Sequence, residues 1–195
     1  MNTSDLIKHF AEATHLPVDV NEVLAVLQQS GCDDDIEFIG VDLDPEILQG
    51  KIKIFYARPV LYAEPKRFAN IYYHRRHGSD WQRFICCKEL LHLLDPTSAH
   101  TNSTDAIDVL AEKIGLPPEM QDPVADGIAT NVDRMAEWRA AAILLPLASR
   151  NVLLEPFREG VLTLDDIARM ADIPRRYVGL VMSPIWDQVH RILAQ

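Results

Sequence analysis

Three residues that could do chemistry together lie within one short segment: Lys88, Glu89 and His92. On a helix, Lys88 and His92 lie one turn apart on the same side, and Glu89 is displaced from Lys88 by about 100°. With histidine at position 88 the segment would read H-E-x-x-H. In that pattern two imidazoles bind one zinc ion, and the glutamate deprotonates the metal-bound water. The segment therefore contains most of a hydrolytic metal site, with lysine in place of the first ligand.

Lysine at this position changes the electrostatics of such a site. A protonated amine has no lone pair for a metal, and two like unit charges repel by about 4 kcal/mol at 4 Å and an effective dielectric of 20. Deprotonating a lysine at neutral pH costs several kcal/mol. We therefore predict that Lys88 takes the place of the metal. Its ammonium group would pair with Asp133 or Glu89 and hold two helices together.

Two stretches, Arg83–Asp95 and Asp133–Pro146, carry a further pattern. The first resembles R-F-[ST]-x-A-H-E-x-x-H of the ImmA/IrrE-like metallopeptidases, gluzincin-type proteins common beside bacterial and phage repressors. The second is similar to that family's E-x-x-A-x-x-F-A-x-x-L-L-x-P, with Asp133 at the place of the acid. The resemblance implies a zincin-like domain in which two histidines and the later acid hold zinc. Carried over to this chain, it makes Glu89 the catalytic base if the protein is active, and His92 and Asp133 residual metal ligands.

The resemblance and the lysine together predict a degenerate, zincin-like pseudoenzyme. It would have no peptidase activity and no cofactor, and it would act by binding a regulatory protein, which the resemblance suggests is a transcriptional repressor. The first alternative is an active metal-dependent endopeptidase that cleaves a repressor-type protein and holds zinc in a rebuilt, non-standard ligand set. The candidate replacement ligands are Cys86, Cys87, His74, His77 and His100. Each also has a purely structural interpretation: the cysteines pack inside an apolar helix and the histidines lie in solvated loops.

The second alternative is a regulator that contacts DNA through its C-terminal helices. Residues 164–178 look like a helix-turn-helix, with Arg175 and Arg176 near the start of the second helix. The formal net charge is −10, which argues against broad nucleic-acid binding but not against one local basic patch. We therefore expect these helices to serve packing, and we expect no nucleic-acid partner.

The elements that would position these residues follow from apolar periodicity and from proline, glycine and capping residues. Helices are predicted at residues 6–10, 20–27, 81–94, 104–114, 122–145 and 163–171, followed by a final helical region at 174–192. Strands are predicted at 37–43, 50–56 and 69–73. The expected fold class is α+β and mostly helical. A small, mostly antiparallel three-stranded sheet would pack against a zincin-like pair of helices. We expect an ImmA/IrrE-type domain over residues 1–150 and a helical C-terminal extension over 151–195, packed on the first.

Composition limits the kinds of protein to which this chain can belong. The chain has 195 residues, 48% of them hydrophobic, which is enough to bury a core without disulfides. The apolar stretch from Ala140 to Ala148 is interrupted by Pro146 and is too short to span a bilayer at about 20 residues. The first residues have no basic and apolar segments typical of a secretory signal. Three cysteines do not make a disulfide framework, so we expect a reduced, cytoplasmic protein with no membrane partner.

Overall fold

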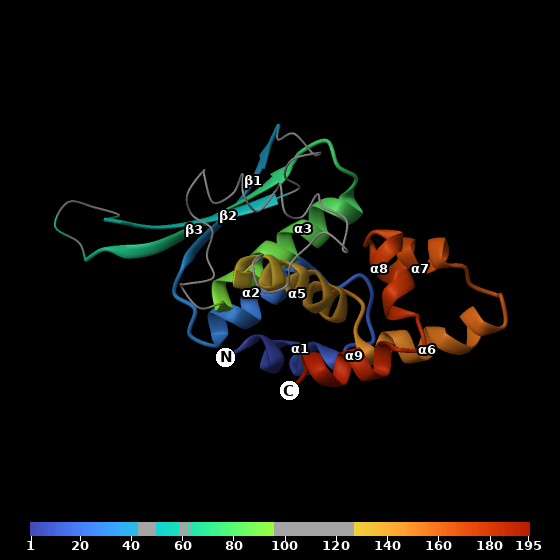
Figure 1. Cartoon of the computed structure of the whole chain (residues 1–195). Helices are drawn as coiled ribbons and strands as arrows, with labels where there is room; N and C mark the ends of the chain where they lie inside the picture. Colours follow the sequence, from blue (N-terminus) through green and yellow to red (C-terminus); the bar gives the residue numbers. More distant parts are fainter. Residues whose placement is uncertain (43–49, 59–61, 63, 96–126) are drawn as a thin grey trace.

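The computed structural model describes residues 1–42, 50–58, 62, 64–95 and 127–195, and for residues 127–133 it describes the backbone alone (Figure 1). The predicted helix at 104–114 lies outside these residues. The described chain confirms an α+β fold with a three-stranded sheet and a helical C-terminal region.

The sheet has the order β1-β3-β2, with β1 at Asp35–Val41, β2 at Gly50–Ala57 and β3 at Lys66–His74. β2 pairs antiparallel with β3, in the register Ile52↔Ile71. β1 pairs with the other edge of β3 in parallel, in the register Phe38↔Ile71. The sheet is therefore mixed, where a mostly antiparallel one was expected. Alternation of apolar and polar residues marks a half-buried strand but is the same for both pairings, so the sequence did not reveal the direction of β1.

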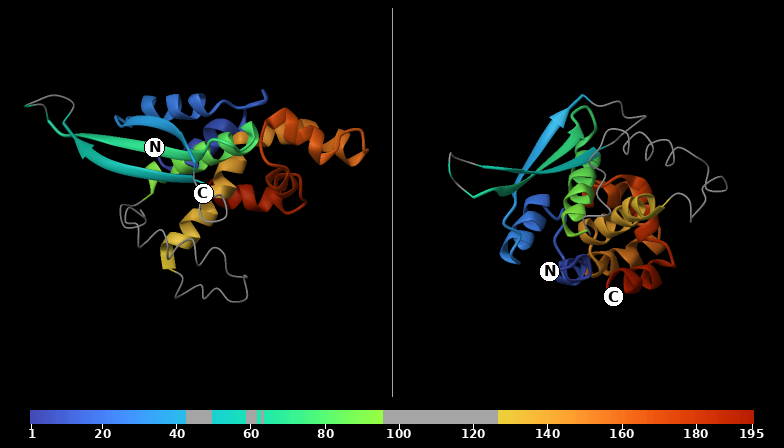
Figure 2. Two further views of the ribbon diagram at one scale, coloured as in Figure 1. Left: turned by 90° about the horizontal axis from the view of Figure 1, so that it is seen from above. Right: turned by 60° about the vertical axis from the view of Figure 1, so that its left-hand side comes forward.

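Alternation along the strands gives the sheet one apolar face. Buried or half-buried side chains on this face pack against the helices: Ile36, Phe38, Ile52, Ile54, Ala69 and Ile71. The described helices lie on this side of the sheet, and the β2–β3 hairpin extends past them (Figures 1 and 2). The opposite face of the hairpin carries the residues between these apolar ones, namely Lys51, Lys53 and Phe55 of β2 and Phe68, Asn70 and Tyr72 of β3.

The described helices follow most of the predicted ones. They are α1 (Thr3–Ala11), α2 (Val20–Gln29), α3 (Ser79–Leu91) with the 3-10 turn η1 (His92–Leu94), α5 (Gly127–Leu144), α6 (Leu147–Arg158), α7 (Leu164–Ala171), α8 (Arg175–Val181) and α9 (Trp186–Leu193). The predicted caps Asp19 and Thr163 accept backbone hydrogen bonds, and Thr163 forms a full capping box with Asp166. One helix, α6, was not predicted from the sequence. The final helical region predicted at 174–192 consists of two helices, α8 and α9, with Pro184 between them.

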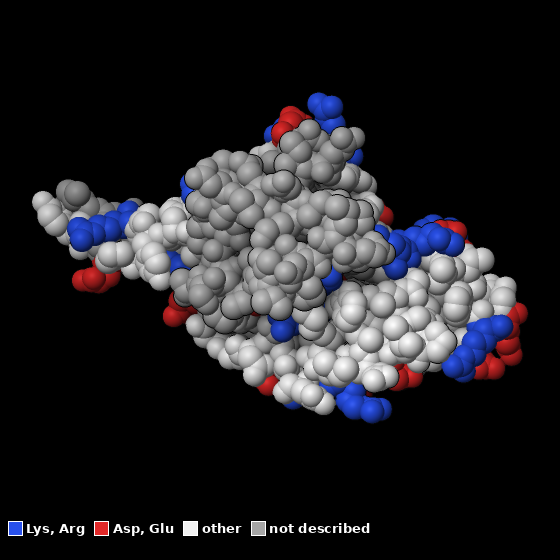
Figure 3. All heavy atoms as spheres, in the orientation of Figure 1, with Lys and Arg blue, Asp and Glu red and all other residues white. Residues whose placement is uncertain are grey.

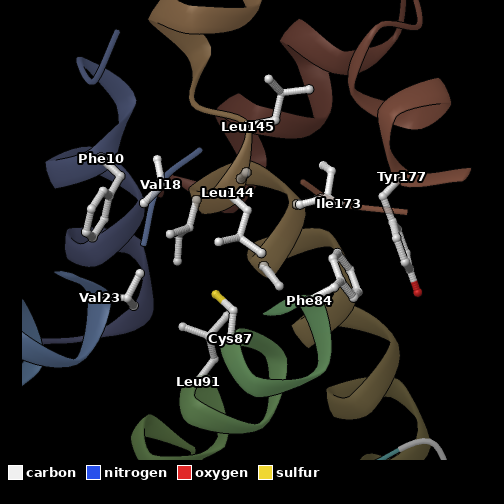
Figure 4. Packing of buried hydrophobic residues seen from close by; sticks show 14 of the residues in the cluster. Phe10, Val18, Val23, Phe84, Cys87, Leu91, Leu144, Leu145, Ile173 and Tyr177 are labelled. Carbon is white, nitrogen blue, oxygen red and sulfur yellow. The ribbon is translucent and has the colours of Figure 1, made fainter. Parts of the chain in front are cut away.

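Helix α3 packs against α5 on one side and against β2 and β3 on another. Figure 4 shows its buried side chains among those of the core. Its apolar residues Phe84, Cys87 and Leu91 are at most 1% exposed. Phe84 stacks on Tyr177 of α8 with ring centroids 3.7 Å apart, which joins the C-terminal helices to α3. The core is therefore continuous from α1 to the C-terminal helices.

Two arginines connect distant segments through backbone carbonyls. Arg83 of α3 donates to the carbonyl oxygens of Val18 and Asp172, and it also pairs with the Asp172 carboxylate at 3.1 Å. Arg150 is 2% exposed and donates to the carbonyl oxygens of Val181 and Ser183, and to the Asp187 carboxylate at 2.7 Å. The predicted domain boundary at residue 150 lies inside α6, at this arginine.

None of the helices in the described ranges is both long and apolar enough to cross a membrane alone. The segment Arg134–Leu144 together with α6 passes the same test of length and composition, with a bend of 76° between the two.

Gly50 allows β2 to approach α3 closely, and its substitution is the first test of this packing. A Cβ atom at position 50 would lie 2.2 Å from Cγ2 of Ile85 and 3.4 Å from Cγ of Glu89. We expect Gly50→Ala to lower the free energy of unfolding by about 1–3 kcal/mol, because strand and helix must separate. Urea unfolding measures the change. Gly179→Ala is the control, because its nearest neighbour would be 3.9 Å away. Equal effects of the two substitutions would contradict the close approach.

His190 of α9 makes stability depend on pH. Burial lowers the pKa of His190 from 6.5, and the guanidinium of Arg150 lowers it further, whereas Asp187 opposes the shift. Its Nε2 is buried without a hydrogen-bond partner. The unfolded chain therefore takes up a proton that the folded one resists, so stability is retained above about pH 6.5 and falls as the pH drops below it. We expect melting temperatures measured between pH 7.5 and 5.5 to fall less steeply for His190→Gln than for the wild type. Parallel curves would contradict this role of His190.

Candidate functional site

The C-terminal end of α3 carries the predicted site. The helix begins at Ser79 with Asp80 in its first turn, which favours the helix dipole, and it ends in the turn His92–Leu94. Residue 95 precedes a proline in the sequence, and that disfavours a further helical turn. Lys88 and Glu89 therefore lie in the last regular turn of α3, and His92 lies at its C-cap.

Lys88 and Glu89 form an ion pair, with Lys88 Nζ 3.1 Å from Glu89 Oε1. The lysine side chain is 14% exposed and the glutamate side chain 5%. The two residues diverge around the helix axis, and the long lysine side chain bridges that separation. A carboxylate buried to this extent requires a cation or several hydrogen bonds to remain ionised. Pairing of Lys88 with Glu89 is one of the two arrangements that the sequence predicted.

A second pair of contacting polar side chains lies one turn further along the chain. Nδ1 of His92 is 2.6 Å from Oδ2 of Asp95, and the two side chains are 11% and 7% exposed. Asp95 is also 3.7 Å from Nη1 of Arg139 in α5. An ionised carboxylate can only accept, so Nδ1 of His92 carries the proton in this pair. His92 is thus hydrogen-bonded through Asp95 at the junction of α3 and α5.

Asp95 and Arg139 are site residues that the sequence analysis did not assign. Asp95 follows His92 by three residues, a spacing that brings two side chains to the same side of a helical turn. Arg139 stands where the family pattern has phenylalanine. A cation replacing an apolar residue in a buried pattern is the signal that could have identified it.

Some predicted site residues lie outside the described part of the chain. The backbone of Asp133 belongs to α5, but its side chain is not among those described, and neither is His100. The predicted pairing of Lys88 with Asp133 and the role of Asp133 as a residual ligand therefore stay predictions. His74 is the buried last residue of β3, where a solvated loop was expected, and His77 lies in the turn that precedes α3; their ring centroids are 4.9 Å apart.

The cysteines of α3 have the properties of packing residues. Cys86 is 8% exposed and Cys87 is fully buried. Burial raises the pKa of the Cys86 thiol to about 12, and the charge of Glu89 raises it further. Burial also raises the pKa of Cys87. The thiolate, which is the nucleophile and the metal ligand, is therefore disfavoured at both positions.

Arg175 and Arg176 lie away from Lys88 and Glu89, and both contact other residues of the chain. Arg175 pairs with Asp165 at 2.9 Å. The Arg176 guanidinium lies 4.6 Å from the Trp81 ring centroid and 4.5 Å from that of Tyr177, and it is 3.7 Å from Glu137. Arg176 therefore fastens α8 to α3 and α5.

The described residues do not fit the zinc site that the resemblance implies. A cation occupies the position of the first imidazole ligand, and it pairs with the glutamate that would act as base. Within the described ranges, no group of three or more His, Cys, Asp or Glu side chains is placed to hold a metal ion. The arrangement offers instead two largely buried side-chain contacts at the C-terminal end of α3, Lys88 with Glu89 and His92 with Asp95.

Comparison with known proteins adds no family to this geometry. No model of a known protein family matches the sequence, and a search of curated proteins finds no significant match.

Substituting Lys88 tests whether its charge holds the site together. We expect Lys88→Met to lower the free energy of unfolding by about 3–5 kcal/mol, because it leaves a carboxylate buried beside an uncharged side chain. Adding Glu89→Gln should recover much of this loss, because an amide tolerates burial better than a carboxylate. Urea unfolding measures both variants, with Lys8→Met on the exposed surface of α1 as the matched control. A Lys88→Met variant as stable as that control would show that the ammonium group is dispensable.

Proposed function

We propose that this chain is a zincin-like, ImmA/IrrE-type protein without peptidase activity, which acts in the cytoplasm by binding a regulatory protein. The observation that carries the proposal is the ion pair between Lys88 and the buried Glu89. The family part of the proposal is supported by the two sequence stretches described above, and the partner class, a transcriptional repressor, comes from the same resemblance.

The ion pair removes two requirements for peptide hydrolysis. A general base must reach the water that it deprotonates, with a pKa near the working pH. Glu89 contacts the ammonium group of Lys88 at 3.1 Å, so its carboxylate is already engaged in an ion pair. The same ammonium repels any divalent ion that would polarise the water.

The surroundings of the pair support a binding role. β2 lies at an edge of the sheet, with β3 as its one described neighbour, and its first residue, Gly50, packs on Glu89. An edge strand presents backbone donors and acceptors to which an extended segment of another protein can add. A partner bound along β2 would therefore lie beside Lys88 and Glu89, where the family resemblance implies a substrate cleft.

Metal content tests the proposal directly. Purified wild-type protein dialysed against zinc is expected to retain none above a Lys8→His control, because Lys88 opposes the ion. Lys88→His should gain zinc if the other residues of the family site are in place, and adding His92→Ala should abolish that gain. Elemental analysis by mass spectrometry measures all four samples. One equivalent of zinc on the wild type, lost on His92→Ala, would overturn the proposal in favour of the active endopeptidase.

A binding experiment tests the second half of the proposal. We expect a repressor-type partner to bind wild-type protein and Glu89→Gln with equal affinity and to remain uncleaved by both, because recognition does not require the carboxylate. Titration calorimetry and gel electrophoresis measure the two outcomes. Cleavage by the wild type that Glu89→Gln abolishes would overturn the pseudoenzyme assignment.

A further inference from the structure

Positive charge is concentrated in one part of this acidic chain. Seven of the 19 lysines and arginines fall between residues 50 and 76, beside a single acidic residue, Glu64, so the segment carries +6 in a chain of net charge −10. This segment is the β2–β3 hairpin with the loop that follows it. Cationic side chains are visible along the projecting hairpin in Figure 3. Such asymmetry marks a surface that meets an anionic partner.

Neighbouring acids neutralise some of these cations. Lys66 pairs with Asp35 and Arg67 with Asp34, both acids lying at or just before the start of β1. In contrast, Lys51 and Lys53 of β2 form no ion pair with any described residue. They lie on the side of β2 opposite Ile52 and Ile54, which face the helices.

Aromatic side chains share this outer face with the two lysines. The register places Lys51 beside Tyr72, Lys53 beside Asn70 and Phe55 beside Phe68. The rings of Phe55 and Phe68 stack with centroids 5.6 Å apart and an interplanar angle of 15°, and Lys53 Nζ is 5.9 Å from the Phe55 centroid. The hydroxyl of Tyr72 accepts a hydrogen bond from the Asn70 amide at 3.2 Å.

From this juxtaposition we propose that the outer face of the β2–β3 hairpin binds single-stranded nucleic acid. Bases stack on the rings of Phe55, Phe68 and Tyr72, and Lys51 and Lys53 pair with phosphates. Aromatic and cationic residues that share one face of a sheet suit this ligand, because each base has a π face and each nucleotide carries one negative charge. In a double helix the bases are stacked on one another and are not available to stack on aromatic side chains.

The same face argues against an acidic peptide as the occupant. A carboxylate-rich segment needs cations alone, whereas here Tyr72 lies beside Lys51 on the neighbouring strand, and Phe55 follows Lys53 on the same face of β2. The acids of β1, Asp35 and Glu37, lie across β3 from Phe55 and Lys53. Because these carboxylates repel phosphates, the proposed nucleic-acid strand would lie along β2 and β3 and not along β1. The helix-turn-helix-like segment at the C-terminus takes no part in this site.

Fluorescence anisotropy of labelled twelve-nucleotide oligothymidylate and oligouridylate tests the proposal on the full chain. We expect saturable binding at 50 mM salt to one or both oligomers, and the comparison shows whether DNA or RNA is preferred. Phe55→Leu and Phe68→Leu should each weaken binding about five-fold or more, the lower end of what a stacked base contributes. Tyr56→Leu is the matched control, because Tyr56 is 71% exposed and lies on the other side of the same strand. It should change the affinity less than two-fold.

Salt dependence tests the lysines separately. Lys53→Gln should reduce the slope of log affinity against log salt by about 0.7, the value for one phosphate contact on a single strand. Lys8→Gln on α1 should leave the slope unchanged. Circular dichroism checks that each variant is folded. No binding by the wild type, equal weakening by Tyr56→Leu and Phe55→Leu, or equal binding of polyglutamate of the same charge would each overturn the proposal.

Discussion

A carboxylate beneath a sheet has to be neutralised by the protein itself, and the candidate site is built around that constraint. Glu89 lies on the central helix, under the first residue of β2, with 5% of its side chain exposed. Lys88 supplies the opposite charge from the next position of the chain. The ion pair between Lys88 and Glu89 therefore both neutralises the buried carboxylate and forms the candidate site. A substitution that breaks this pair would affect the stability of the fold as well as the site.

Elements that depend on local features, such as helix caps and strand-forming runs, could be predicted from the sequence. Asp19 and Thr163 cap the helices that they were expected to begin, and the β2 and β3 segments were found from their alternation. The sequence was insufficient where distant contacts decide. The parallel pairing of β1 leaves no mark on its own residues, and α6 tolerates Pro156 because its apolar residues pack on the core. For the site, proximity along α3 predicted that Lys88 could meet Glu89. The contact of Asp95 with Arg139 depends on how α5 crosses α3, which no local pattern encodes.

The proposed binding surfaces occupy different parts of the same small sheet. One is the edge of β2 that pairs with no described strand, beside Glu89, and the other is the outer face of β2 and β3, where Lys53 and Phe55 lie. Because side chains alternate across a strand, β2 can present backbone groups at its edge, apolar residues to the core and cations to the outside. A regulatory protein could thus engage one surface while a nucleic-acid strand engages the other.

The buried Arg150 has a consequence for how this chain can be shortened or rearranged. Its guanidinium donates to carbonyl oxygens and a carboxylate from residues 181–187. A fragment that ends before these residues would leave the charge of Arg150 without its partners. The last fifteen residues are therefore an integral structural unit rather than a dispensable tail. Recombination that exchanged this end of the protein for another sequence would have to bring along equivalent acceptors for that one side chain.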